Sequence, residues 1–343
     1  MDFFIDLGTS YFRIGVSGSE EIINEPCVVA WDELGRVIVG TEAEQILGRN
    51  PYGVEVLHPI EDGSIKHFDA AVNVIKYAVT KFLPGRFPRR FNLTLSVPSG
   101  LTDVERRVFK EIGEQAGARQ VKLFDSTVAA AIGADLPIGQ PIGCLVVNLG
   151  AGVTQAAVMS MNGVVDKRFS KTGGRTVDTS IVEMLRKNYG FLIGLRSAED
   201  LKLRYAEQLD VESFEARGRN LRTGLPDSIL VPRTLIEQQL KTYYETIVNL
   251  VVETLETCPP ELVGDIMDRG IVLVGGNAKM ADILPSLTRR TEVPIVIAQS
   301  PETCVVRGLM QTNNGTAKSA TWKSLFKTGD PSNTNSKGIT QKG

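Results

Sequence analysis

Short apolar runs alternate with longer segments of helical periodicity along most of the chain, and this alternation predicts α/β layers. Residues 3–17 and 28–40 each contain two apolar runs separated by a glycine-containing turn, so each predicts a β-hairpin. Residues 69–82 and 103–116 carry apolar side chains every three or four positions and predict helices. The same patterns predict strands over 93–97 and 270–274, and helices over 180–188 and 236–256.

The second half of the chain begins as the first half does. Residues 144–149 form a buried type of strand, a Gly-Ala-Gly turn follows, and residues 155–160 return. This repeats the strand–glycine turn–strand order of the N-terminus and predicts an internal pseudo-repeat. We therefore expect two related halves, residues 1–140 with 29–62 inserted and residues 141–311 with 175–232 inserted.

Composition narrows the class of protein. The 343 residues are 42% hydrophobic and 23% charged, as in an ordinary globular chain, and the net charge of -2 argues against a nucleic-acid partner. Four scattered cysteines and two histidines give little support to a zinc site, so free thiols in a reducing cytoplasm are expected. The N-terminus has no basic segment followed by a long apolar run, which argues against a signal peptide.

Two basic segments stand apart from this pattern. Residues 312–343 are rich in Asn, Gly, Ser, Thr and Lys, and five lysines against one aspartate give 5 - 1 = +4, which predicts a disordered tail. Residues 84–91 form a Pro- and Gly-containing loop with Arg86, Phe87, Arg89 and Arg90. Basic residues beside an aromatic suit an anionic lipid surface, whereas the alternative is a surface turn whose phenylalanines cover the local core.

Three glycine-containing turns are candidates for anion binding. In the first, Asp6 precedes Gly8, Thr9 and Ser10, where backbone N–H groups and hydroxyls can approach a phosphate, and Asp6 can hold the water shell of Mg²⁺. A tight turn with a capping aspartate is the alternative. The matching turn of the second half contains Gly150, Gly152 and Thr154, and two such turns facing each other would clamp a phosphate chain from both sides.

The third turn, Gly275-Gly276-Asn277-Ala278, follows a strand and offers small residues for close approach of an adenosine; a plain strand-to-helix turn is the alternative. Glu199 and Lys202 share a helix face and could flank a ribose or purine, although a surface ion pair is the usual meaning of that spacing.

The order of several short motifs resembles the MreB family of bacterial actin-like rod shape-determining proteins. The motifs are Asp-Leu-Gly-Thr at 6–9, Asn-Glu-Pro at 24–26, Val-Pro-Ser-Gly at 97–100, Ala-Ala-Ala-Ile-Gly-Ala at 129–134, Thr-Gly-Leu-Pro at 223–226, Cys-Pro-Pro-Glu-Leu at 258–262 and Asp-Arg-Gly-Ile-Val-Leu at 268–273. The resemblance covers residues 1–311.

This resemblance implies an actin-like fold (a duplicated, ribonuclease H-like α/β fold) around a cleft that binds ATP and Mg²⁺. It also implies self-assembly into filaments at the inner membrane face, with the cell-wall elongation machinery as partner. Carried over by position, the phosphate contacts would be Gly8, Thr9, Ser10, Tyr11, Gly150, Gly152, Val153 and Thr154, and the adenosine contacts Glu199, Lys202, Gly275, Gly276, Asn277 and Ala278.

Four positions depart from the family pattern. Where the family has Glu-Glu-Pro, whose second Glu positions the attacking water, this chain has Asp125-Ser126-Thr127, and the usual Asp and Glu of the second turn are Asn148 and Gln155. The usual Gly-Gly-Asp ends in Arg175. We therefore expect nucleotide binding with slow or absent hydrolysis, with Asp125 as a substitute carboxylate and Asp178 as a further ligand for the metal shell.

Three other functions are alternatives to a nucleotide-binding filament protein. A small-molecule kinase of the same superfamily would need a catalytic acid or base in the cleft and a larger substrate domain. A heat-shock chaperone ATPase would need a longer chain. A non-hydrolysing scaffold or regulatory partner of a competent MreB paralogue would tolerate the substitutions in the cleft.

Overall fold

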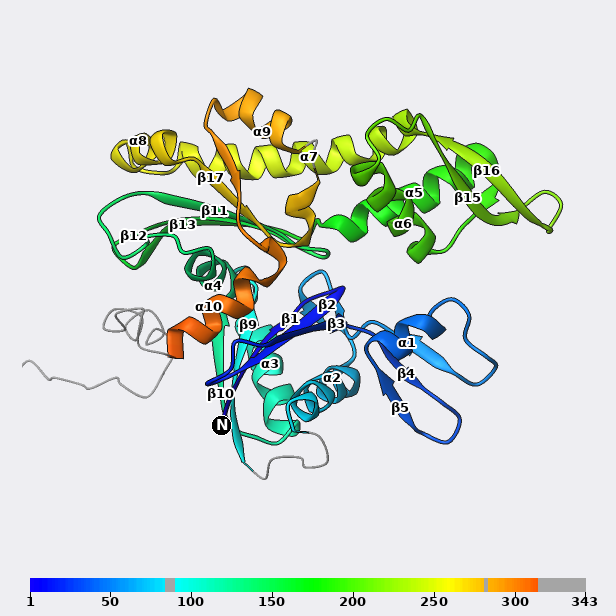
Figure 1. The fold of residues 1–343 in the computed structure, drawn as a ribbon, viewed down its shortest axis with the longest axis horizontal. Coiled ribbons are helices and arrows are strands. Elements are labelled where there is room, and N and C mark those ends of the chain that lie inside the picture. The colour runs from blue at the N-terminus through cyan, green and yellow to red at the C-terminus, as the bar shows by residue number, and fades with distance from the viewer. Residues whose placement is uncertain (84–89, 281–282, 314–343) are drawn as a thin grey trace, which may run out of the picture.

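The computed structural model describes residues 1–83, 90–280 and 283–313, and its backbone forms two halves, each built on a five-stranded mixed sheet (Figure 1). The first sheet has the order β10-β9-β1-β2-β3 and consists of β1 (Asp2–Leu7), β2 (Tyr11–Val16), β3 (Ile22–Pro26), β9 (Phe91–Val97) and β10 (Ala118–Asp125). The second has the order β13-β12-β11-β17-β18 and consists of β11 (Cys144–Leu149), β12 (Thr154–Ser160), β13 (Gly163–Ser170), β17 (Ile271–Val274) and β18 (Ile295–Ile297).

The two sheets confirm the predicted pseudo-repeat. In each sheet the first three strands of the half form an antiparallel meander, and two further strands join in parallel beside its first strand. The outer faces carry the helices α2 (Phe68–Lys81) and α3 (Asp103–Gln115) in the first half, and α7 (Arg233–Glu256), α8 (Pro260–Arg269) and α9 (Ile283–Thr291) in the second (Figure 1). No helix among the described residues is both long and apolar enough to span a membrane.

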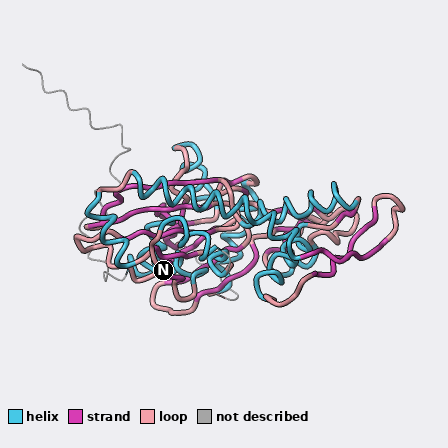
Figure 2. Tube along the Cα trace, turned by 90° about the horizontal axis from the view of Figure 1, so that it is seen from above, coloured by secondary structure: helices cyan, strands magenta, loops and turns pink. Residues whose placement is uncertain are grey.

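Each half carries a small inserted subdomain, and both extend from the same end of the molecule (Figures 1 and 2). The first contains β4 (Val29–Trp31), β5 (Val37–Val39), β6 (Glu55–Leu57) and α1 (Thr41–Ile46), and is followed by the β7 (Ile60–Glu61) and β8 (Ser64–Ile65) hairpin. The second contains α5 (Gly174–Tyr189), α6 (Leu195–Glu207), β14 (Phe191–Leu192), β15 (Ser213–Asn220) and β16 (Pro226–Pro232). Two 3₁₀ turns, η1 (Gly276–Lys279) and η2 (Pro301–Thr303), complete the second half.

Between the sheets lie two helices, α4 (Ser126–Gly133) and α10 (Cys304–Asn313). They pack with inward-facing residues of both sheets, among them Phe4 and Val146, in a core that we call the central core. A Cβ atom on Gly133 would fall on the carbonyl oxygen of Cys304, and one on Gly308 would fall on that of Ala129, so the two backbones touch. The halves are thus joined by a helix crossing that only glycine permits at these positions.

The structure adds detail to three predicted elements. The predicted second half, 141–311, includes α10, which also packs on the first sheet because its apolar residues belong to the central core. The helix expected over 180–188 begins at Gly174, six residues earlier (180 - 174 = 6). In α3 the apolar residue Val104 is 74% exposed, and the helix buries Phe109 and Ile112.

All four cysteines are buried and unpaired, as expected for free thiols. Among the described residues there is also no cluster of three or more His, Cys, Asp or Glu side chains that could hold a metal ion.

His58 links the first inserted subdomain to the first half and titrates abnormally. Its Nδ1 lies 3.2 Å from the carbonyl oxygen of Cys27, which makes Nδ1–H the donor of the neutral ring. Burial, followed by the nearby positive charge of Arg175, lowers the pKa of His58 to about 4. Because the unfolded chain binds this proton near the ordinary pKa of 6.5, stability is complete above that pH and is lost as the pH falls toward 4.

We expect the His58→Gln variant to show a weaker loss of stability on acidification than the wild type. Glutamine can still donate to Cys27 but does not titrate, so about 2 kcal/mol of the loss between about pH 7.5 and pH 5 should disappear. Urea unfolding at both pH values measures it, with the exposed His67→Gln as the matched control. An unchanged pH dependence in His58→Gln would contradict the assignment.

Candidate functional site

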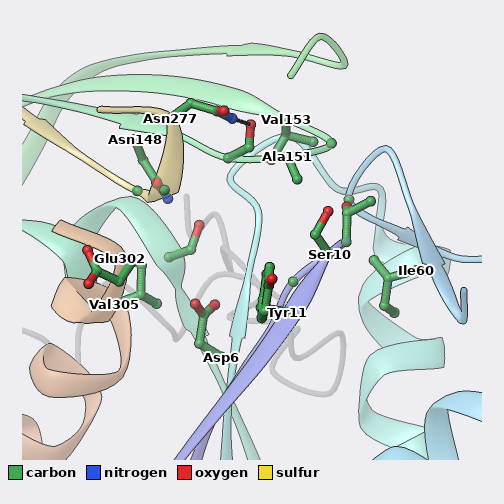
Figure 3. A pocket seen from close by; sticks show the side chains of 18 of the residues that line it. Asp6, Ser10, Tyr11, Ile60, Asn148, Ala151, Val153, Asn277, Glu302 and Val305 are labelled. Atoms are coloured by element: carbon green, nitrogen blue, oxygen red, sulfur yellow. Dashed lines mark hydrogen bonds between the residues drawn. The ribbon is translucent and has the colours of Figure 1, made fainter. Parts of the chain in front are cut away.

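A cavity of about 330 Å³ opens where the glycine turns of the two halves meet, beside the central core (Figure 3). Its volume lies within the range of small-molecule sites. The residues that line it include Asp6, Gly8, Thr9, Ser10, Tyr11, Arg13, Asn24, Ser96, Ser126, Asn148, Gly150, Gly152, Val153, Gln155, Asp178, Glu199, Lys202, Gly275, Gly276, Asn277, Lys279 and Glu302.

The two hairpin turns that border the cavity have the same construction. Gly8 N–H donates to the carbonyl of Tyr11 at 3.1 Å, and Gly150 N–H donates to the carbonyl of Val153 at 2.9 Å. A Cβ atom at either glycine would lie within 3.0 Å of that carbonyl oxygen, so no larger residue closes the turn without a shift. The sequence repeat is therefore a repeat of turn geometry.

The turns also face each other across the two halves. A Cβ atom on Gly152 would fall on the hydroxyl of Thr9, and a Cβ atom on Gly63 would approach the Val153 side chain to 2.8 Å. The space between the turns is thus bounded by backbone and by small side chains. Such a gap can admit an anion to the N–H groups of both turns.

A third wall follows β17. Gly275 has φ +88°, and a side chain there would meet the carbonyl of Leu149 at 2.5 Å, so both conformation and space require glycine. The Asn277 amide donates to the carbonyl of Gly150 at 2.8 Å and ties this wall to the second turn (Figure 3).

Strand alternation explains which polar side chains point inward. On β1, Phe3 and Ile5 belong to the outer core of the first half, whereas Phe4 belongs to the central core. Asp6 has the same parity as Phe4 and therefore faces the other half. The same rule turns Arg13 of β2 inward, because its neighbours Phe12 and Ile14 face outward. By the same rule Asn148 and Gln155 project from the second sheet toward the first half.

Most acidic side chains in the cavity already have a cationic partner. Four carboxylates line it, and three of them form ion pairs with its three lining cations: Asp6 with Arg13 at 3.5 Å, Asp178 with Lys202 at 2.7 Å, and Glu302 with Lys279 at 3.1 Å. Ser96 also donates to Asp6 at 2.6 Å. We expected Asp6 and Asp178 to bind the water shell of Mg²⁺. Both carboxylates instead form ion pairs with side chains of the protein, so the residues present do not fit a metal site.

The pair of Asp178 and Lys202 is buried. Lys202 also donates to the carbonyl of Gly174 at 3.1 Å, so the ammonium holds the start of α5 against α6. Burial raises the pKa of Asp178 to about 6, against the opposing effect of the Lys202 charge. Lys202 lines the cavity, as the predicted ligand contact requires, and its ion-pair partner is Asp178 rather than Glu199.

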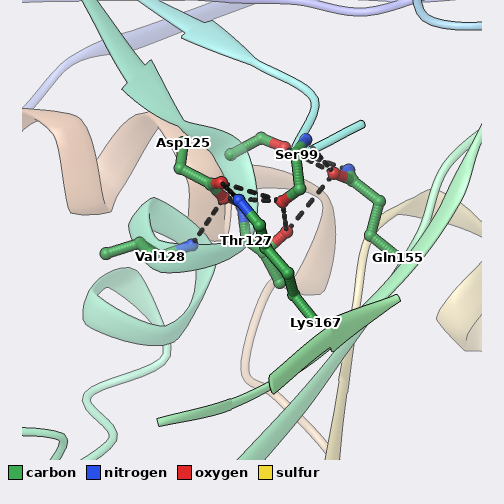
Figure 4. A network of polar contacts seen from close by, with 7 residues as sticks. Ser99, Asp125, Thr127, Val128, Gln155 and Lys167 are labelled. Carbon is green, nitrogen blue, oxygen red and sulfur yellow. Dashed lines mark hydrogen bonds and ion pairs between the residues drawn. The ribbon is translucent and has the colours of Figure 1, made fainter. Parts of the chain in front are cut away.

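A second polar network ties the halves together behind the cavity (Figure 4). Gln155 Oε1 accepts from the backbone of Ser99 at 2.8 Å and from Thr127 Oγ1 at 3.3 Å, while Gln155 Nε2 donates to Ser126 Oγ at 3.0 Å. Asp125 caps α4, accepts from Ser99 Oγ at 2.8 Å and pairs with Lys167 at 3.6 Å.

The contacts in this network fix the positions of Asp125 and Ser126, the two candidate catalytic residues. Asp125 does not line the cavity, so it does not supply a substitute carboxylate there. Ser126 and Gln155 do line it, but they are bonded to each other. Arg175 lies outside the lining; its backbone N–H donates to Ala151, and its Nη1 is buried with no hydrogen-bond partner among the described residues.

The two inserted subdomains touch beside the cavity. Arg196 of α6 donates to the backbone carbonyl of Glu44 in α1 at 3.3 Å. Tyr11, which lines the cavity, lies close to this contact: burial, and then the carboxylates of Glu44 and Glu199, raise its pKa. The contact joins the halves at the end opposite to the central core.

Most of the predicted binding residues come together, with two exceptions. Thr154 and Ala278 are fully buried and do not line the cavity; the Thr154 hydroxyl donates to the carbonyl of Thr172. In the predicted membrane loop, Arg86, Phe87 and Arg89 lie outside the described residues, and Arg90 is exposed. Residues 314–343 of the predicted tail also lie outside the described residues.

Sequence reasoning missed Arg13, Asn24, Ser96, Lys279 and Glu302. The first three sit on strands, and the hairpin register, which pairs Asp6 with Arg13 and Arg13 with Asn24, could have identified two of them.

Comparison with known proteins shows the family of this chain. Residues 1–321 match the MreB/Mbl protein family model. The chain is 39% identical over 317 residues to the cell shape-determining protein MreB of Escherichia coli K12, covering 90% of this chain and 91% of that one. It is 36% identical over 313 residues to Mbl of Bacillus subtilis 168, covering 90% and 94%.

Solved structures show the same fold. MreB5 of Spiroplasma citri bound to ADP superposes with a TM-score of 0.84 at 29% identity, over 91% of this chain and 96% of that one. The same protein bound to AMPPNP gives a TM-score of 0.84. A chain of the MamK double helical filament, at 18% identity, gives 0.76 over 92% and 99% and supports the fold alone. This chain has the actin-like fold and belongs to the MreB/Mbl family of cell shape-determining proteins.

Proposed function

We propose that the protein binds an adenine nucleotide in the cavity and assembles into filaments that act in cell-shape determination. The observation that carries this proposal is the pair of matching glycine turns, with Gly152 set against Thr9. Two tight glycine turns that face each other from opposite halves suit a phosphate chain, and the family relation to nucleotide-bound MreB5 points to ATP or ADP. Magnesium is left out of the proposal because Asp6 and Asp178 have cationic partners.

Hydrolysis is proposed to be slow or absent. A general base or water-orienting group must accept a hydrogen bond from the attacking water. Gln155 is neutral and its oxygen accepts bonds from Ser99 and Thr127, and Ser126 is neutral and bonded to Gln155. Losing such a group typically costs about a hundredfold or more in rate.

The same network favours a second candidate function, a non-hydrolysing scaffold or regulatory partner of a competent MreB paralogue. Gln155 and Ser126 join the halves by neutral hydrogen bonds that need no nucleotide to form. A kinase is less well supported, because three of the four carboxylates that line the cavity are held in ion pairs.

The proposed location is cytoplasmic, at the inner membrane face, with the cell-wall elongation machinery as partner. The basic, Phe-containing loop 84–91 is the proposed lipid contact. Its C-terminal flank is anchored, because Phe91 is buried in an edge-to-face contact with Phe3 at 5.6 Å while the adjacent Arg90 is exposed.

Nucleotide-dependent assembly is tested by electron microscopy of the purified protein with and without ATP. We expect filaments with ATP, and none for Gly152→Leu, whose side chain would fill the gap beside Thr9. Gly264→Leu in α8 is the matched control, because a Cβ atom there meets nothing within 4 Å. Filament formation by Gly152→Leu at the wild-type level would count against a role for the turns, and absence of wild-type filaments together with tight binding to another MreB chain would favour the scaffold.

The hydrolysis proposal predicts phosphate release about a hundredfold below that of a hydrolysis-competent MreB at equal filament mass. Ser126→Glu should raise the rate, because it restores a carboxylate on the cavity wall. Rapid release by the wild type that Asp6→Ala abolishes would refute slow hydrolysis; release that survives Asp6→Ala would come from a contaminant.

Membrane contact predicts co-flotation with anionic liposomes and little with neutral ones. Replacing Phe87 by Ser and the three arginines 86, 89 and 90 by Ser should abolish flotation, since both the inserting ring and the attracting charges are removed. The matched control replaces Arg107, Arg217 and Arg222, exposed residues outside the loop. Flotation that is equal for both variants would remove the loop from the proposal.

A further inference from the structure

Arg13 lines the cavity and is one of the residues there that the sequence motifs did not single out. It lies on β2 directly opposite Asp6, and the side chain is only 13% exposed although it lines the cavity. Its Nη1 lies 3.5 Å from Asp6 Oδ2, and the guanidinium carbon lies 5.8 Å from the centre of the Tyr11 ring. The side chain is therefore held in place before any ligand arrives.

The guanidinium has unused donor capacity. It carries five N–H donors, and its Nε is buried without a hydrogen-bond partner among the described residues. A buried donor without a partner destabilises the protein unless a ligand satisfies it. A phosphate oxygen is the acceptor that the planar guanidinium fork fits best.

Arg13 also places a positive charge beside Asp6, where a metal ion would need negative charge. A divalent ion beside Asp6 would face a fixed cation within ion-pair distance of the same carboxylate, and the lining residues Asn148 and Gln155 add no negative charge. Arg13 is therefore the source of the misfit at Asp6, as Lys202 is at Asp178.

We propose that Arg13 is a phosphate-binding residue that supplies the positive charge a divalent cation would otherwise supply, so that the cavity takes its nucleotide without magnesium. This inference rests on the proposed nucleotide binding. It implies that removing Arg13 has two effects: it deletes a phosphate contact, and it frees Asp6 to hold the water shell of a metal ion.

Titration calorimetry of the full chain with ATP tests the proposal, in buffer with Mg²⁺ and in buffer with EDTA. For the wild type we expect affinities within about threefold of each other. Arg13→Leu should bind about tenfold or more weakly in EDTA, as expected for a lost charge-assisted hydrogen bond, and Mg²⁺ should restore much of the affinity. Arg13→Lys should keep the wild-type insensitivity to metal.

Arg217→Leu is the matched control, because it removes an 82% exposed guanidinium from β15, and thermal melting of each variant reports folding independently of ligand. A wild type that loses affinity tenfold in EDTA would overturn this inference and leave the proposed function standing. Arg13→Leu with wild-type affinity in both buffers would also overturn it. If the wild type binds ATP in neither buffer, the proposed function fails, and this inference fails with it.

Discussion

The contact between the backbones of α4 and α10 is the constraint on which the rest of the structure depends. At Gly133 and Gly308 each helix lies directly against carbonyl groups of the other, so the pair forms a layer of fixed thickness between the sheets. That thickness sets the distance between β1 and β11, and hence between the turns that follow them. Because interiors are close-packed and transmit strain, a wider crossing would move Thr9 away from Gly152.

Binding and chemistry depend on different parts of this frame. The proposed phosphate contacts are backbone N–H groups of the turns, whose positions follow from glycine geometry rather than from neighbouring side chains. Hydrolysis depends on side chains, and here Asn148 and Gln155 keep the shape of carboxylates without their charge. Gln155 gains hydrogen bonds across the halves in exchange, with Ser99 from the first half and Ser126 from α4. The chain thus combines the paired glycine turns with hydrogen bonds between neutral side chains that join the halves.

Much of the fold could be predicted from the sequence because it rests on local patterns. The strand β11 was predicted with its observed bounds, and both glycine turns were located, since alternation and turn residues act over a few positions. The packing of α10 on the first sheet and the position of Asp125 away from the cavity depend on contacts distant in sequence. Arg13 is intermediate: its inward direction follows from strand parity, but its partner Asp6 follows only from the hairpin register.

The contact between Arg196 and Glu44 bears on exchange kinetics. It joins the inserted subdomains beside Tyr11, so a path out of the cavity at that end would require α1 and α6 to separate. The acceptor is a main-chain carbonyl, which means that no substitution of the Glu44 side chain removes it. Subdomain opening of this kind takes microseconds to milliseconds. The residence time of a molecule bound in the cavity would then depend on how often the two subdomains separate.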